Sequence, residues 1–533
     1  MAPRVLISDK LSPAAIEIFK RRGVEVEFRP GLSSAELRAI IGSFDGLAVR
    51  SVTKVTRELL EAAPNLKVVG RAGIGVDNVD VTSATARGVV VMNTPFGNAI
   101  TTAEHAIAMM FALARQIPEA STSTKAGKWE KNRFMGVELF GKTLGLIGCG
   151  NIGSIVADRA AGLKMKVVAF DPFLSEQRAI ELGVEKVELS ELLERADIVS
   201  LHAPLTEQTR NILSRDRLLG MKKGARLINC ARGGLVDEAA LYEALKSGHL
   251  AGAALDVFEI EPATDSPLFT LENVVCTPHL GAATAEAQEN VALQVADQMA
   301  DYLLTGAVSN AINMPSVTAE EAPRLKPYME LARLLGGMAG QLTAAQGDPG
   351  QGAIRAIRVE YEGAAAELNH KPLTAAALAG VLAPLMGAVN MVNAPVLARQ
   401  RGIEVAETVH ERHGDYATLV RLSVVTDRHE RSVAGTLVGQ GKPRLVEIKG
   451  IAVEADFAPH MLYVTNQDKP GFIGRFGLAL ADAGINIATL HLGRTGPGGD
   501  AICLVALDAP TPEPVLREVR RMPLVVQATP LRF

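Results

Sequence analysis

The chain has 533 residues, 48% of them hydrophobic, and its 55 basic and 59 acidic side chains leave a formal net charge of −4. This length exceeds what one hydrophobic core supports and predicts three or four domains. The near balance of charge, spread without long runs, argues against nucleic acid as a partner.

The sequence also lacks the marks of a membrane or secreted protein. No stretch of about twenty apolar residues could span a bilayer, and the N-terminus has no apolar signal-peptide core. The four cysteines, Cys149, Cys230, Cys276 and Cys503, are scattered without a Cys-x-x-Cys spacing. We therefore expect a cytoplasmic protein with no membrane partner, no disulfide framework and no metal site.

The N-terminal part alternates short apolar runs with helical patterns, which predicts an α/β lobe with a parallel sheet. Its expected strands are Val5–Ser8, Val24–Phe28, Gly46–Val49, Lys67–Gly70 and Val89–Met92. A long helical pattern over Ala99–Arg115, which ends before Pro118, is expected to connect this lobe to the next one.

A glycine turn follows, in Lys142–Gly153. An apolar strand ends in Gly148-x-Gly150-x-x-Gly153, and apolar residues then recur at helical spacing. Gly148 permits a tight turn, Gly150 lets a pyrophosphate approach the backbone, and Gly153 lets the helix pack on the strand. The helix N-terminus offers its N–H groups to phosphates.

A second signal supports a dinucleotide site. Asp171 ends the next apolar strand, eighteen positions after Gly153. A carboxylate there accepts hydrogen bonds from a ribose 2′-hydroxyl and repels a 2′-phosphate, which favours NAD over NADP. The upstream stretch Gly73–Asn78 has glycines too, but it lacks the third one and is not interpreted as a nucleotide site.

Polar residues follow later strands of this second lobe. Its remaining expected strands are Ile198–Leu201, Arg226–Asn229, Ala253–Val257 and Val274–Cys276, and a helix over Ala285–Leu304 is expected to return to the first lobe. Two lobes joined by two crossings form a cleft that closes on ligands.

Arg232, Glu261 and His279 are expected to face that cleft. An arginine holds a carboxylate with two parallel N–H bonds, and a histidine transfers protons near neutral pH. A neighbouring glutamate fixes the imidazole tautomer and favours its protonated form. Each residue also has a structural interpretation: a surface ion pair, a loop histidine, a turn residue. His105, after Glu104, and His202 are interpreted as structural.

The C-terminal half changes character. Residues 315–455 contain an expected helix, Thr374–Leu385, two long expected strands, Thr418–Val425 and Arg444–Val453, and no chemical motif. Residues 460–533 alternate in the order strand, helix, strand, strand, helix, strand, which is the split βαβ pattern.

The glycine turn, Asp171 and the stretches NCARGGLVDEAAL, ALDVFEIEP and TPHLGAAT resemble the D-isomer-specific 2-hydroxyacid dehydrogenases. The stretches LAVRSVTKVT and VVGRAGIGVDNVD, the middle region and the tail narrow this resemblance to the long form of the D-3-phosphoglycerate dehydrogenases. It covers essentially the whole chain.

The resemblance implies an α/β fold. Two doubly wound parallel-sheet lobes are expected, a flavodoxin-like substrate lobe (1–98 and 284–314) and a Rossmann NAD lobe (99–283). Two α+β regulatory domains follow, an intervening domain (315–455) and a ferredoxin-like ACT domain (460–533). Relatives assemble as tetramers or dimers, so a homo-oligomer is expected.

The resemblance also implies an activity and its residues. The expected reaction is the NAD-dependent oxidation of 3-phospho-D-glycerate to 3-phosphohydroxypyruvate, the first step of L-serine biosynthesis. Arg232, Glu261 and His279 would be the catalytic set. The implied NAD contacts are Gly148, Gly150, Asn151, Ile152, Gly153, Asp171, Ala203, Cys230, Ala231, Arg232, Asp256, His279 and Gly281.

Substrate and effector residues are implied in the same way. The substrate set is Arg50, Arg71, Gly73, Ile74, Gly75, Arg232 and His279; some relatives carry a further basic residue where this chain has Val52. For a serine effector held between paired ACT domains the set is Asn466, Asp468, Gly471 and Asn486. Arg421, Arg428 and Arg431 could bind an anion in the middle domain, although a solvated strand edge is the favoured interpretation.

Two alternatives stay open on the residues alone. One is a dehydrogenase for another D-2-hydroxy acid, such as 2-hydroxyglutarate or glycerate. The other is a non-enzymatic NAD-sensing protein of the co-repressor type, which would keep the glycine turn and Asp171 without useful turnover.

Overall fold

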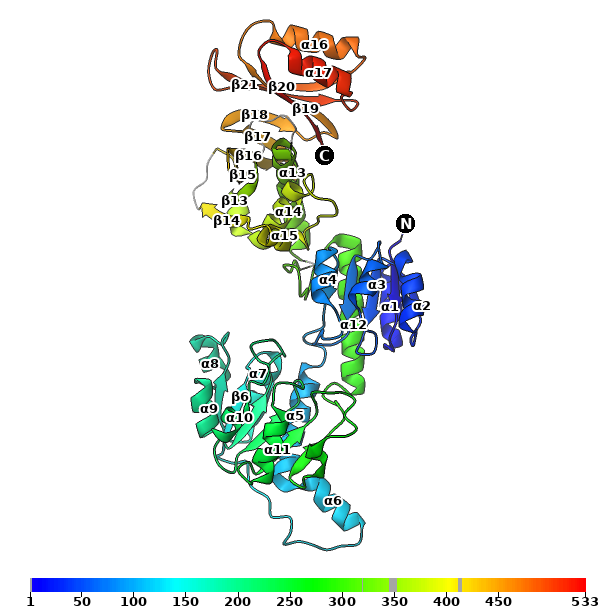
Figure 1. Ribbon diagram of the computed structural model, residues 1–533, viewed down its shortest axis with the longest axis vertical. Coiled ribbons are helices and arrows are strands. Elements are labelled where there is room, and N and C mark those ends of the chain that lie inside the picture. The colour runs from blue at the N-terminus through cyan, green and yellow to red at the C-terminus, as the bar shows by residue number, and fades with distance from the viewer. Residues whose placement is uncertain (1, 319, 345–351, 411–414) are drawn as a thin grey trace.

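The computed structural model describes residues 2–318, 320–344, 352–410 and 415–533. Figure 1 shows an elongated molecule with the seven-stranded lobe at one end and the C-terminal domain at the other. The N-terminal lobe and the middle domain lie between them, and the long helix α12 (Ala285–Thr305) runs through the N-terminal lobe toward the seven-stranded one.

The N-terminal lobe is built on a five-stranded parallel sheet with the order β2-β1-β3-β4-β5. This is the flavodoxin-like order, as expected. The strands lie within a residue or so of their predicted positions: β1 (Arg4–Ile7), β2 (Glu25–Phe28), β3 (Gly46–Val49), β4 (Val68–Arg71) and β5 (Val90–Met92). The side chains of β1, β3, β4 and β5 are almost all buried, because helices cover both faces, whereas the edge strand β2 is partly exposed.

Helix α12 and helix α1 (Pro13–Arg21) cover one face of that sheet, where Val291, Val295 and Met299 pack on the strands. The opposite face packs against α2 (Ser34–Ile40), α3 (Arg57–Glu61) and α4 (Val81–Ala86). The return of the chain through α12, predicted as a helix over Ala285–Leu304, is thus part of the core of this lobe.

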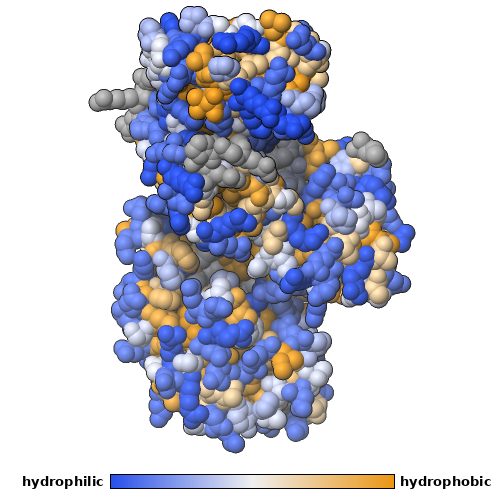
Figure 2. Space-filling view, turned by 45° about the horizontal axis from the view of Figure 1, so that its top comes forward, coloured by the Kyte–Doolittle hydropathy of each residue, from blue (hydrophilic) through white to orange (hydrophobic). Residues whose placement is uncertain are grey.

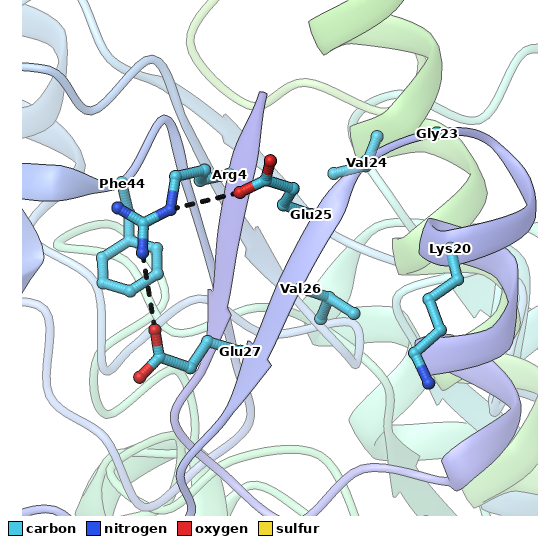
Figure 3. A pocket seen from close by; sticks show the side chains of 8 residues that line it. All are labelled: Arg4, Lys20, Gly23, Val24, Glu25, Val26, Glu27 and Phe44. Atoms are coloured by element: carbon cyan, nitrogen blue, oxygen red, sulfur yellow. Dashed lines mark ion pairs between the residues drawn. The ribbon is translucent and has the colours of Figure 1, made fainter. Parts of the chain in front are cut away.

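A hollow of about 580 Å³ lies at the edge of this sheet, beside β2. Figure 3 shows that Arg4 lies over the ring of Phe44 and pairs with Glu25 and Glu27, at 3.6 Å each. Charged side chains on an edge strand discourage pairing with another chain. Because Arg4 and Glu25 begin their strands, this hollow lies away from the carboxyl ends where ligands of such sheets bind.

The second lobe is a seven-stranded parallel sheet with the order β12-β11-β10-β9-β6-β7-β8. The chain order reverses between β6 and β9, which is the Rossmann arrangement expected from the sequence. The strands are β6 (Thr143–Ile147), β7 (Lys166–Phe170), β8 (Glu185–Lys186), β9 (Ile198–Leu201), β10 (Arg226–Asn229), β11 (Gly252–Leu255) and β12 (Val274–Cys276).

Two helical layers cover this sheet. One contains α5 (Ala99–Arg115) and α7 (Asn151–Gly162), and the other contains α9 (Leu189–Arg195), α10 (Arg215–Leu219) and α11 (Glu238–Lys246). Helix α8 (Glu176–Leu182) borders β8. Helix α5 ends at Arg115, and the next residue, Gln116, has a left-handed backbone (φ 51°). Helix α6 (Ile117–Lys125) then begins with Pro118 in its first turn, so the predicted helix end is confirmed.

The middle domain is a six-stranded sheet with the order β14-β13-β15-β16-β17-β18. Its strands are β13 (Ile354–Gly363), β14 (Glu404–His410), β15 (Thr418–Thr426), β16 (Glu430–Val438), β17 (Lys442–Ile448) and β18 (Ile451–Asp456), and its helices are α13 (Ala322–Ala344), α14 (His370–Leu382) and α15 (Ala394–Gln400). The helix expected over Thr374–Leu385 begins four residues earlier and ends at Leu382.

One strand prediction in this domain is wrong. Arg444–Val453 is not a continuous strand but the two arms of a hairpin, in which Ile448 pairs with Ile451. The turn residues Lys449 and Gly450 have φ values of 49° and 75°. Two left-handed residues give the tight turn whose twist matches paired strands.

The C-terminal domain has the predicted split βαβ order, with an antiparallel sheet β20-β21-β19-β22. Its elements are β19 (His460–Gln467), α16 (Phe472–Asp482), β20 (Ile487–Arg494), β21 (Asp500–Leu507), α17 (Glu513–Arg521) and β22 (Val525–Arg532). Helices α16 and α17 cover one face, and the other face joins the core of the middle domain through residues such as Tyr463 and Leu504.

None of the helices in the described ranges is long and apolar enough to cross a membrane. Figure 2 shows hydrophilic side chains over most of the visible surface, with apolar side chains in smaller patches between them.

Candidate active site and cofactor cleft

The glycine turn joins β6 to α7 with two tight contacts and one open side. A Cβ on Gly148, whose φ is 94°, would lie 2.6 Å from the carbonyl oxygen of His202, and a Cβ on Gly153 would lie 2.2 Å from that of Gly148. A Cβ on Gly150 would meet no atom within 4 Å. No side chain caps the N-terminus of α7. Room beside Gly150 and uncapped N–H groups fit the pyrophosphate of a dinucleotide.

Asp171 follows β7 and faces that turn. Its Oδ2 accepts a hydrogen bond from the backbone N–H of Cys149, and its Oδ1 accepts one from that of Phe173, each at 2.8 Å. A carboxylate oxygen has more than one acceptor position, so each can also accept from a ribose hydroxyl. The residues that surround the turn therefore suit NAD.

The other expected NAD contacts lie along the same edge of the sheet. Asn151 and Ile152 begin α7, Ala203 follows β9 against the Gly148 turn, and Cys230 and Ala231 follow β10. His202 is half-buried, its Nε2 lies 2.9 Å from the Ser200 hydroxyl, and desolvation of the ring lowers its pKa to about 4. This agrees with a structural interpretation of His202.

His279 and Glu261 form a hydrogen-bonded pair. The His279 Nδ1 atom lies 2.7 Å from Glu261 Oε2, and the Phe258 N–H donates to Glu261 Oε1 at 3.1 Å. Burial acts to raise the pKa of Glu261, but the hydrogen bonds from His279 and Phe258 together lower it below its usual range. Glu261 is thus held as a carboxylate against the imidazole.

Asp256 anchors the loop that carries His279. Its side chain is fully buried, and it accepts hydrogen bonds from the Thr277 hydroxyl (2.6 Å) and from the N–H groups of Leu280 (2.7 Å) and Gly281 (2.8 Å). Burial opposes its ionisation, yet the hydrogen bonds from His105, Thr277 and Leu280 lower the pKa of Asp256. The nearby Cys230 thiol is buried, which raises its pKa.

Arg232 lies between the two lobes. Its Nε atom is 2.9 Å from Oδ2 of Asp77, which comes from the N-terminal lobe, and its Nη1 donates to the Ala231 carbonyl at 2.6 Å. Sequence reasoning missed Asp77. The signal was present, because Asp77 lies in the glycine-containing stretch directly after β4, at a carboxyl end of the first sheet.

A cavity of about 560 Å³ between the lobes brings six of the expected residues together. They are Arg50, Arg71, Gly73, Arg232, Glu261 and His279. Burial and the nearby Arg232 and Arg50 charges lower the pKa of Arg71 to about 10, and its Nε has no hydrogen-bond partner. Three guanidinium groups at one cavity create a site for an anion with several charges.

The loops around this cavity are fixed by buried polar groups. Asp9, only 4% exposed, accepts hydrogen bonds from the backbone N–H of Arg50 (2.6 Å) and from the Thr53 hydroxyl (2.7 Å). Of the remaining expected substrate residues, Gly75 faces the Arg232 guanidinium, and the Ile74 carbonyl accepts a hydrogen bond from Asn93 at 2.6 Å.

The four expected effector residues do not meet within one chain. Asn466, Asp468 and Gly471 follow each other from the end of β19 to the start of α16. Asn486 precedes β20 and donates to Asp508 at 2.8 Å. Because Ile487 pairs with Leu507 while Arg494 and Asn466 both pair with Ala501, Asn486 lies at the opposite end of the sheet.

The three middle-domain arginines were interpreted as a solvated strand edge, and this interpretation is wrong for Arg431 and Arg421. Arg431 is only 5% exposed. Arg421 forms an ion pair with Glu447 and lies 3.9 Å from Glu360, while Arg428 is exposed. Both exceptions lie within the sheet, on β15 and β16, where neighbouring strands cover them.

Comparisons with known families match three parts of the chain. Residues 107–281 match the NAD binding domain of the D-isomer specific 2-hydroxyacid dehydrogenases. Residues 324–449 match the D-3-phosphoglycerate dehydrogenase intervening domain, and residues 460–523 match the ACT domain.

Similar proteins extend the match to nearly the whole length. The chain is 42% identical to the D-3-phosphoglycerate dehydrogenases of Methanocaldococcus jannaschii and Bacillus subtilis, and the match covers 98% of both chains in each case. Among solved structures, a glyoxylate reductase from Paecilomyes thermophila is 29% identical with a TM-score of 0.55, over 58% of this chain and 98% of that one. A D-lactate dehydrogenase from Aquifex aeolicus complexed with NAD and lactic acid is 26% identical with a TM-score of 0.52, over 59% and 100%.

Proposed function

Because this chain belongs to the D-3-phosphoglycerate dehydrogenases, we propose that Arg232, Glu261 and His279 are the residues with which it oxidises 3-phospho-D-glycerate to 3-phosphohydroxypyruvate, the first step of L-serine biosynthesis. The observation that carries this assignment is one cavity that holds the His279–Glu261 pair, Arg232 and two further arginines.

Proton transfer falls to the His279–Glu261 pair. Glu261 holds the Nδ1 side of the imidazole, which leaves Nε2 to accept the proton of the C2 hydroxyl. The Glu261 carboxylate then stabilises the imidazolium that forms, as a carboxylate beside a histidine does in general acid–base catalysis. NAD⁺, when bound, accepts the hydride from C2.

Arg232 orients the substrate. Its guanidinium can bind the C1 carboxylate with two parallel N–H bonds, which fixes the plane of the reacting carbon. Asp77 holds the Nε side of Arg232 across the cleft, so the substrate carboxylate is expected to engage the Nη atoms. Since the two residues come from different lobes, this contact also links substrate binding to the arrangement of the lobes.

Arg50 and Arg71 recognise the phosphate in this proposal. Arg71 is half-buried beside other positive charges and has an unpaired Nε. A phosphate dianion would supply the missing acceptor and relieve the repulsion among the three guanidinium groups. A substrate without a phosphate would leave that positive charge uncompensated.

NAD is held by the glycine turn and its surroundings. The N-terminus of α7 and Gly150 would receive the pyrophosphate, and Asp171 the adenosine ribose. The strand ends at Ala203, Cys230, Ala231 and Asp256, together with Gly281, would surround the nicotinamide half.

Single substitutions test the catalytic assignment. His279→Ala and Arg232→Ala should each lower turnover of 3-phosphoglycerate with NAD⁺ by about 10²–10⁴-fold, because proton transfer and carboxylate binding are lost. Arg215→Ala, at an exposed residue of the same lobe, serves as the control. Turnover within a few-fold of the wild type in either cleft variant would contradict the assignment.

A substrate panel tests the phosphate role. 3-Phosphoglycerate, glycerate and 2-hydroxyglutarate should be compared in the wild type and in Arg50→Gln and Arg71→Gln. We expect the phosphorylated acid to be preferred and that preference to shrink in both variants. Equal activity on glycerate would favour another D-2-hydroxy acid, and inactivity on the whole panel would favour an NAD-sensing protein.

Serine binding and assembly belong to the same proposal. Asn466 and Asp468 lie at one end of the ACT sheet and Asn486 at the other, so two copies are needed to bring them together around one serine. The segment after α6 exposes the large apolar side chains of Trp129 (85%), Met135 (78%) and Phe140 (73%), which a second copy of the chain would bury. We therefore propose a homo-oligomer.

Two measurements test these points. L-Serine should lower the rate of the wild type, and Asn466→Ala with Asp468→Ala should remove that response while basal turnover stays unchanged. Trp129→Glu should reduce the mass measured by light scattering. An unchanged mass would contradict a role of this segment in assembly.

A further inference from the structure

We propose that His105, on the crossing helix α5, is a positioning residue that holds the His279 loop in its active geometry through Asp256. This inference rests on the proposed role of His279 and adds a residue outside the catalytic set. It also replaces the interpretation of His105 and Glu104 as a merely structural pair.

The His279 backbone needs external support. Its φ is 55°, in the left-handed region, which is strained for a residue with a side chain. Such a conformation persists only where surrounding contacts hold it. Here the N–H groups of His279, Leu280 and Gly281 all donate to Asp256, the first to its carbonyl at 2.9 Å and the other two to its carboxylate.

The orientation of the Asp256 carboxylate therefore determines the conformation of the His279 loop, and His105 helps to fix that orientation. His105 Nε2 lies 3.2 Å from Asp256 Oδ1 and 3.2 Å from the Thr277 hydroxyl. The Thr277 hydroxyl is 2.6 Å from the same Oδ1 and has one proton to donate. Because Thr277 gives that proton to Asp256, it can only accept from His105, so His105 Nε2 must be the donor in both contacts.

A second contact from the same helix supports this assignment. The Thr102 hydroxyl lies 2.9 Å from the carbonyl oxygen of Gly281 and 3.0 Å from that of Asn98, so its proton is shared between these two acceptors. Thr102 and His105 are three residues apart and thus lie on one face of α5. Helix α5 connects the two lobes, so the loop that carries His279 is held by the element that joins them.

Three substitutions of His105 differ in whether they keep a hydrogen-bond donor at the position of Nε2. The amide nitrogen of a glutamine can take the place of His105 Nε2 and donate there, whereas leucine has no donor and asparagine is too short to place one at that point. Glu104→Gln, at the exposed neighbouring residue, is the matched control.

We expect His105→Leu and His105→Asn to lower kcat on 3-phosphoglycerate by about 10–100-fold, because a small misplacement of a reacting group costs that much rate. KM for the substrate should stay within about two-fold, because the arginines at the cavity are untouched. His105→Gln should stay within about three-fold of the wild-type kcat, as should Glu104→Gln. Melting temperature and NADH affinity are measured for every variant.

A double-mutant cycle separates positioning from general destabilisation. If His105 acts through His279, then His105→Leu should lower the residual rate of a His279→Gln enzyme by less than about two-fold, because the group it positions is already gone. An equal loss in both backgrounds would overturn the proposal, and so would a loss of kcat in His105→Gln as large as that in His105→Leu.

Wild-type turnover in His279→Gln alone would instead refute the proposed function. Should His105→Leu not fold, the comparison of His105→Asn with His105→Gln decides the same question.

Discussion

Gly150→Ala separates cofactor binding from folding more cleanly than any other substitution in the glycine turn. In the described structure a Cβ at this position meets no atom within 4 Å, and the backbone φ is −76°, which any residue adopts. The variant should therefore fold, with at most a modest loss of stability because alanine replaces glycine at the N-cap of α7. The added methyl group would occupy the space in which the pyrophosphate approaches the N-terminus of α7.

The size of the effect follows from that overlap. Forcing one extra methyl group into a close-packed contact costs about 1–3 kcal/mol. Because about 1.4 kcal/mol corresponds to a tenfold change in Kd, the NADH Kd should rise about 5- to 150-fold. Calorimetry or NADH fluorescence measures the Kd, and thermal unfolding measures the stability.

Two control variants show whether a change in NADH affinity is specific to Gly150. Gly162→Ala, at the other end of α7, also has nothing within 4 Å and should affect neither property, apart from a small gain in helix stability. Gly148→Ala combines a φ of 94° with a contact at 2.6 Å to the His202 carbonyl and should lower stability as well as affinity. A Gly150→Ala protein with an unchanged melting temperature and an NADH Kd within two-fold of the wild type would refute the placement of the pyrophosphate.

Three further outcomes are expected. Arg71→Gln should raise KM for 3-phosphoglycerate about 10- to 100-fold by removing a charged hydrogen bond, without lowering the melting temperature, since burial and neighbouring positive charges already lower the pKa of Arg71 to about 10. Asp9→Ala should cost about 1–3 kcal/mol in chemical unfolding and raise the same KM, because it leaves the N–H groups of Arg50 and Thr53 unpaired. Hydrogen bonds from His279 and Phe258 outweigh burial and lower the pKa of Glu261 below 4.5. The ionised Glu261 side chain should therefore stabilise the folded state above pH 4.5, and this contribution should disappear as the pH falls through the folded-state pKa. Urea unfolding from pH 7 to pH 3 should show the stability difference between wild type and Glu261→Gln shrinking toward acid, and a constant difference would contradict this.

The predictions from sequence failed where a local pattern had two solutions. The run from Arg444 to Val453 looks like one strand because it is rich in valine and isoleucine, but Lys449 and Gly450 turn the chain back on itself. Gly450 was the available signal of a turn, because glycine adopts positive φ without strain. Helix α13 was not anticipated, and Pro327 lies inside it, where a proline normally indicates a helix end.

The amino-acid sequence alone determined the two parallel sheets, the glycine turn and the position of Asp171 at a strand end. Hydrophobic periodicity and backbone freedom depend only on residues that are close in the chain. Only the tertiary structure decided which polar side chains meet. Asp77 and Arg232 are 155 positions apart, and His105 and Thr277 are 172 apart. Their contacts arise from the packing of α5 and of the two lobes against each other, and no sequence spacing encodes a distance across a cleft. These partners also set the pKa values: hydrogen bonds outweigh burial and lower the pKa of Asp256 and Glu261, whereas burial and neighbouring arginines lower that of Arg71.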